Sequence, residues 1–82
     1  MASRRTAPLS QQIADKLLAD FRAGEKYGPG DKLPNENDLS EEYGISRGTL
    51  RESIRILTAG GILEVKRGIG TFVSKNLPEN PV

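Results

Sequence analysis

Apolar residues recur at helical spacing in the first third of the chain and describe one buried stripe. The stripe consists of Leu9, Ile13, Leu17, Leu18 and Phe21. This pattern predicts a helix over residues 9–23, which ends before Gly28-Pro29-Gly30 because that run forms turns and cannot continue a helix. Pro34 then pushes its predecessor out of the helical region, so residues 32–34 are expected to form a minimal strand.

A very tight turn follows the second predicted helix. Asn35 is a good N-cap for this helix, which we expect over residues 36–43. Gly44 ends it, because glycine tolerates the left-handed conformation of a helix C-cap, and Ser46 is the next N-cap. Two helices joined by so short a turn are typical of a helix-turn-helix.

The third helix is expected over residues 47–59, and a glycine pair ends it. Its inward face carries Leu50, Ile54 and Leu57. The periodicity then changes, since residues 62–66 and 71–74 are rich in β-formers and flank the turn Arg67-Gly68-Ile69-Gly70. These features predict a β-hairpin, and with it a mainly α-helical fold that carries a small hairpin.

The chain is long enough for one small domain and too short for two. Residues 9–75 hold the predicted elements and form that domain. Residues 1–8 are expected to be a flexible arm, because they offer nothing to bury. Residues 76–82 have no apolar pattern and are interpreted as the start of a linker to an absent C-terminal domain.

The composition argues against an enzyme. The chain has no cysteine and no histidine, which excludes disulfides, thiolate nucleophiles, imidazole bases and the usual zinc sites. We expect no catalytic residue, no metal and no cofactor. No apolar run approaches the roughly 20 residues that span a bilayer, and no secretory signal is visible, so we expect a cytoplasmic protein without membrane contact.

Charge is distributed unevenly along the chain, although the formal net charge is only +1. Residues 1–45 hold six basic and eight acidic side chains, whereas residues 46–75 hold six basic and two acidic ones, a net +4. Such an asymmetry is equally typical of a solvated surface, so the positions of the charges decide its meaning.

Three arginines form a ridge on the third predicted helix. Arg47, Arg51 and Arg55 are spaced by four, and their mutual repulsion is unfavourable without an anionic partner. Arginine presents a planar fork that matches guanine or a phosphate, and the start of a recognition helix reaches furthest into the major groove of DNA. Arg47 and Arg51 are therefore candidates to read bases, and Arg55 to meet a phosphate or solvent. The alternative is that they pair with Glu52 and other acids on a wet helix face.

Residues beside this ridge complete the candidate interface. Thr49 can donate to a phosphate or pack against a thymine methyl, Ser46 can donate to a phosphate, and Gly48 lets the backbone approach closely. At the hairpin tip, Arg67 beside the flexible Gly68 can enter a minor groove or grip the flanking backbone. An ordinary glycine-rich turn is the alternative for the tip.

Three ordered segments of this sequence, at residues 30–39, 45–52 and 68–73, resemble the signature of the GntR family of bacterial repressors and activators. The resemblance spans about residues 9–75. It implies a three-helix winged helix-turn-helix whose recognition helix and wing bind a DNA half-site. It also implies DNA contacts by Arg47, Thr49, Arg51, Arg67 and Gly68.

The resemblance further implies a homodimer that forms through a C-terminal domain, binds a small-molecule effector and reads a palindromic operator. The isolated fragment is expected to be a monomer, since no apolar face beyond the core is evident. Many family members carry an arginine where this chain has Asn37, so Asn37 is expected to donate to a phosphate or to alter the operator preference. Two other functions stay open: a winged helix that binds an acidic protein, and the first domain of an aminotransferase-like fused regulator.

Overall fold

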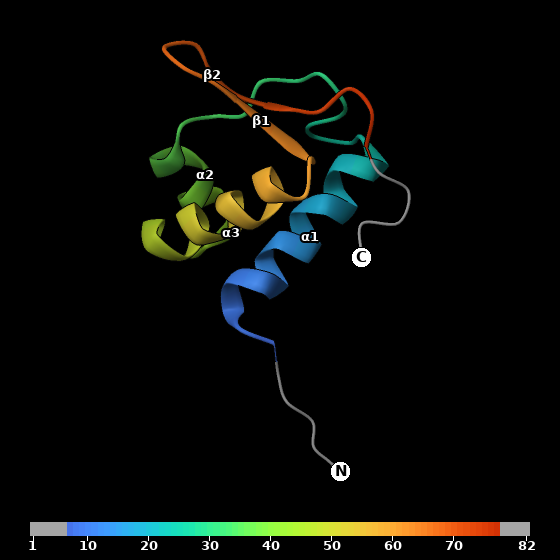
Figure 1. Cartoon of the computed structure of the whole chain (residues 1–82). Coiled ribbons are helices and arrows are strands. Elements are labelled where there is room, and N and C mark those ends of the chain that lie inside the picture. Colours follow the sequence, from blue (N-terminus) through green and yellow to red (C-terminus); the bar gives the residue numbers. More distant parts are fainter. Residues whose placement is uncertain (1–6, 78–82) are drawn as a thin grey trace.

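The computed structural model describes residues 7–77 as three helices followed by a hairpin (Figure 1). The elements are α1 (Leu9–Ala23), α2 (Glu36–Tyr43), α3 (Arg47–Ala59), β1 (Leu63–Lys66) and β2 (Gly70–Val73). The two strands are antiparallel, with Leu63 opposite Val73 and Lys66 opposite Gly70. The predicted mainly helical winged helix-turn-helix is confirmed, and all three helices have the predicted bounds. The predicted arm and linker lie largely outside the described residues.

The predicted extent of the strand over residues 32–34 is wrong. Only Lys32 forms a β-bridge, opposite Phe72. The Leu33 N–H still donates to the Thr71 carbonyl at 2.8 Å. The pairing stops at Pro34, which has no N–H to donate. The hairpin strands also differ slightly from the prediction, since β1 begins at residue 63 and β2 covers residues 70–73.

A single core fills the space between the helices and the inner face of the hairpin. It consists of Ala14, Leu17, Phe21, Leu33, Leu39, Leu50, Leu57, Ile62, Leu63 and Val73. The prediction that Leu9 is buried is wrong, because its side chain is 54% exposed. Leu9 is the first residue of α1, where this helix extends past the rest of the fold (Figure 1). Ile54, predicted to face inward, is only partly buried.

Side-chain caps fix the tight turn between α2 and α3. The Asn35 side chain accepts a hydrogen bond from the Asp38 N–H at 2.8 Å, and the Ser46 hydroxyl accepts one from the Thr49 N–H at 3.1 Å. Gly44 adopts φ +66° at the end of α2, a conformation that costs a residue with a side chain about 1–2 kcal/mol. The predicted caps at Asn35, Gly44 and Ser46 are confirmed.

Polar contacts hold α2 and α3 against α1. The Tyr43 hydroxyl donates to Asp20 at 2.7 Å, and burial together with this bond raises the pKa of Tyr43 well above its usual range, so the hydroxyl stays a donor. Lys26 donates to Glu42 at 2.6 Å and lowers the pKa of that carboxyl. On the other side of the fold, the fully buried Ser53 hydroxyl donates to the Ser10 carbonyl at 2.8 Å. These bonds orient the helix-turn-helix on α1.

Candidate nucleic-acid interface

The exposed face of α3 carries the three predicted arginines at residues 47, 51 and 55, all exposed. Arg47, the first residue of the helix, has no carboxylate within 4.0 Å among residues 7–77. Its guanidinium is therefore available to an anion or a base. Arg55 lies 3.8 Å from Glu52, in an exposed pair of the kind that contributes at most about 1 kcal/mol.

Arg51 differs from Arg47 and Arg55 because it is hydrogen-bonded to Glu36, in the first turn of α2. Its Nε and Nη2 atoms both donate to Glu36 Oε1, at 3.3 and 3.1 Å. A guanidinium has five N–H donors, so three of them, at the Nη1 and Nη2 end, have no partner within residues 7–77. Glu36 thus bonds one edge of the guanidinium, and the opposite edge keeps the donors that a bidentate contact uses. Pairing of these arginines with acids was the alternative to base reading, but spacing along α3 does not reveal a partner 15 residues away on α2.

Ser46 and Thr49 contact each other at the start of α3. The Ser46 hydroxyl donates to Thr49 Oγ1 at 2.9 Å, so its proton is already in use, whereas the Thr49 hydroxyl proton has no acceptor in the described part of the chain. Gly48 lies between them in the first helical turn and is exposed. A Cβ added at Gly48 would meet only the Ser46 hydroxyl, at 4.0 Å. The backbone here is therefore open to close approach.

Asn37 lies in the first turn of α2, next to Glu36, and is exposed. Its carbonyl accepts a hydrogen bond from the Ser40 hydroxyl at 2.9 Å. The start of a helix carries a partial positive charge that favours an anion. Asn37 is thus exposed at the positive end of α2, between the acidic residues Glu36 and Asp38.

The hairpin tip presents a cation and an apolar side chain together. Arg67 is exposed and has no carboxylate within 4.0 Å in the described chain, and Gly68 adopts φ +75°. The tip is closed by the Ile69 N–H, which donates to the Lys66 carbonyl at 2.9 Å. Ile69 is 60% exposed, a feature that the hydrophobic pattern did not predict.

These parts lie on one side of the molecule. In Figure 1 the starts of α2 and α3 and the hairpin tip all lie at the left. The Arg51–Glu36 ion pair joins α3 to α2, and an open groove of about 630 Å³ separates the start of α2 from the hairpin. Leu33, Pro34, Ile54, Val65, Ile69 and Thr71 contribute to its lining. Residues of α2, α3 and the hairpin therefore line one groove, and the starts of both helices and the hairpin tip lie at the same side of the fold.

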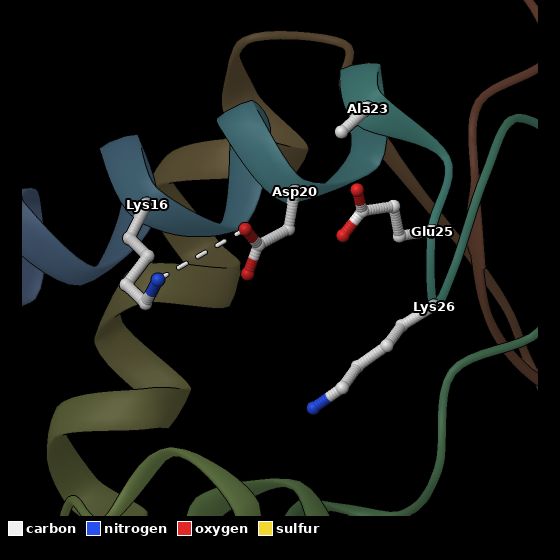
Figure 2. Close-up of a pocket in the computed structure, with 5 residues that line it drawn as sticks. All are labelled: Lys16, Asp20, Ala23, Glu25 and Lys26. Carbon is white, nitrogen blue, oxygen red and sulfur yellow. Dashed lines mark ion pairs between the residues drawn. The ribbon is translucent and has the colours of Figure 1, made fainter.

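A second hollow, of about 230 Å³, lies beside α1 and contains side chains of both signs. Lys16 Nζ lies 4.0 Å from Asp20 Oδ1. Figure 2 shows this ion pair, with Glu25 and Lys26 in the segment after the helix. Among the described residues no group of acidic side chains could hold a metal ion. No helix among them has the length and apolar character needed to cross a membrane.

Three helices, a hairpin wing and a basic recognition helix define the class of this protein: a winged helix-turn-helix domain. Residues 9–73 match the family of bacterial regulatory proteins named after gntR. The chain therefore belongs to the GntR family, as the sequence analysis expected.

Named relatives are transcriptional regulators. The chain is 44% identical, over 68 residues, to the mannosyl-D-glycerate transport/metabolism system repressor MngR of Escherichia coli K12, and the match covers 83% of the chain but 28% of MngR. A crystal structure of AraR(DBD) in complex with operator ORR3 is similar, with TM-score 0.72, 34% identity and coverage of 90% and 88% of the two chains. A transcriptional regulator from Oenococcus oeni, at 24% identity and TM-score 0.78, shares the fold over 93% of this chain and 62% of its own.

Proposed function

We propose that this domain binds double-stranded DNA sequence-specifically and serves as the operator-reading part of a bacterial transcription regulator. The proposal rests on the exposed arginines of α3, one of them held by Glu36, and on the start of α3 and the hairpin tip lying at the same side of the fold (Figure 1). In this arrangement α3 enters the major groove, where Arg47 and Arg51 read bases, and the tip meets the adjacent minor groove or backbone. The AraR(DBD)–operator structure supports the same use of this fold.

The remaining contacts position the domain on the duplex. We assign phosphate contacts to Thr49 and Asn37, and close backbone approach to Gly48 and Gly68. Ser46 acts mainly as the cap of α3, since its proton is used by Thr49. The domain needs no metal or cofactor for this task and is not an enzyme.

We propose that the whole regulator has a second domain in addition to this one. The chain spans 28% of the length of MngR, which leaves room for a second domain in a protein of that size. We propose domain limits at residues 9–75, with a linker to a C-terminal domain that dimerises and binds a small-molecule effector. The full protein then reads a palindromic operator in the cytoplasm, whereas the isolated fragment is a monomer.

Selection of bound sequences from a random duplex pool tests this function. We expect an enriched half-site, and a Kd for the selected duplex that rises steeply with salt because phosphate contacts release counterions. The preference over random duplex should persist at physiological salt. A pool that shows no enrichment would contradict sequence-specific binding, and binding to acidic proteins instead would identify a protein-interaction module.

Replacing Arg67 by alanine is expected to weaken binding while leaving folding intact. The side chain is exposed at the hairpin tip and makes no ion pair within the described chain, so the free energy of unfolding should change by less than about 0.5 kcal/mol. Titration of the selected duplex and a thermal melt measure the two quantities. A large drop in the thermal midpoint would instead assign Arg67 a structural role.

Gly48→Ala should stabilise the fold and at the same time weaken DNA binding. Alanine favours a helix by about 1 kcal/mol over glycine and meets no clash here, so the variant should be more stable. The added methyl group stands where the DNA backbone approaches, so affinity for the selected duplex should fall. Urea denaturation and the same titration measure both effects, and a variant with raised stability and unchanged affinity would remove Gly48 from the interface.

A further inference from the structure

Two lysines, Lys32 and Lys66, stand out on the outer face of the wing. Lys66 and Gly70 are opposite each other across β1 and β2, and Lys32 is opposite Phe72 on the other edge of β2. Because side chains alternate along a strand, all of these positions face away from Leu63 and Val73, which are buried in the core. The Lys66 ammonium lies 4.8 Å from the centre of the Phe72 ring.

Gly70 lets Lys32 lie flat along the sheet towards the hairpin tip. A Cβ at residue 70 would come within 2.6 Å of Lys32 Cε, and Gly70 has φ +147°, a conformation that side chains disfavour. The end of the Lys32 side chain therefore lies over Gly70, the residue opposite Lys66. Lys32 also borders the groove beside α2, so it is close to the proposed interface.

Lys32 and Lys66 belong, with Arg47, Arg67 and Lys75, to the cations that make no ion pair within the described residues. Lys16, Lys26, Arg51 and Arg55 each have a carboxylate within 4.0 Å. Over residues 7–77 neither Lys32 nor Lys66 has one. Glu64 is opposite Phe72 on the same outer face, but it lies more than 4.0 Å from either ammonium group. Both ammonium groups on this face are therefore open to an anion from outside the domain. The wing thus carries cations along its face as well as at its tip.

We infer that Lys32 and Lys66 form a phosphate-binding pair on the wing. This pair binds the DNA backbone beside the minor groove at which the proposed function places Arg67. This inference rests on the proposed function and adds two residues to it. A Lys ammonium acts on a phosphate as a point charge and carries no base specificity, so the pair contributes affinity and salt dependence rather than sequence preference.

The test compares Lys32→Gln, Lys66→Gln and the double variant with the wild-type domain, at several salt concentrations, on a selected duplex and a random duplex of equal length. Each single variant should reduce the slope of log Kd against log salt by about 1, and the double variant by about 2. Affinity should fall by the same factor on both duplexes. Lys16→Gln, which makes the same charge change in the hollow of Figure 2, should leave the slope unchanged.

Arginine variants at the same positions show whether a lower salt slope comes from the lost charge or from a disturbed fold. Lys32→Arg and Lys66→Arg keep the charge, so they should retain the wild-type slope, with thermal midpoints measured for every protein. Slopes for the glutamine variants equal to wild type would overturn the phosphate-binding pair while leaving the proposed function intact. A wild-type domain that binds neither duplex would overturn both.

Discussion

Arg47→Ala is expected to weaken binding to the selected duplex by about 1–3 kcal/mol, or about 5- to 150-fold in Kd. Arg47 opens α3, makes no ion pair within the described chain and is exposed, so its removal leaves the fold untouched. Because it is assigned to a base, the loss should be larger on the selected duplex than on random DNA. Fluorescence titration of both duplexes measures the ratio of the two affinities.

Arg51 gives this prediction a matched comparison on the same helix. Arg51→Lys keeps the charge but loses the fork that Glu36 orients, so sequence preference should fall although the salt slope stays nearly constant. Glu36→Gln should have a smaller effect in the same direction, since it loosens the arginine without removing it. Equal losses on selected and random duplexes for Arg47→Ala would reassign Arg47 to a phosphate.

Much of the fold was predictable because its boundaries depend on local chemistry. Asn35, Gly44 and Ser46 each act through their own backbone or that of residues a turn away, so the bounds of α2 and α3 follow from the sequence. The arginine ridge was predictable for the same reason, since spacing along one helix fixes which residues share a face.

Contacts between distant segments were not predictable from periodicity. Ser53 interrupts the apolar face of α3, and its burial makes sense only once the Ser10 carbonyl of α1 is beside it. The Arg51–Glu36 pair joins residues 15 apart, and Gly70 admits a lysine from a different segment. Leu9 fits the apolar stripe of α1, yet its side chain at the first position of the helix is 54% exposed.

The largest effect on stability is expected for Leu50→Ala, at about 2–5 kcal/mol. Leu50 is completely buried on the core side of α3, one residue before Arg51, so truncation leaves a cavity directly beneath the recognition helix. A chain of 82 residues has about 4–12 kcal/mol of total stability, so this single change removes a large part of it. Urea denaturation should show a much lower midpoint.

Leu50→Ala should weaken DNA binding because less of the domain is folded, whereas Arg47→Ala should weaken it because a DNA contact is lost. Its interface side chains are all present, so a saturating selected duplex should raise its thermal midpoint, because DNA binds only the folded state. Leu50→Met, which nearly conserves volume, should cost less than about 1.5 kcal/mol and keep full affinity. Wild-type stability in Leu50→Ala would mean that α3 does not pack on the core through this residue. The assignment of the arginine face of α3 to DNA would then be wrong.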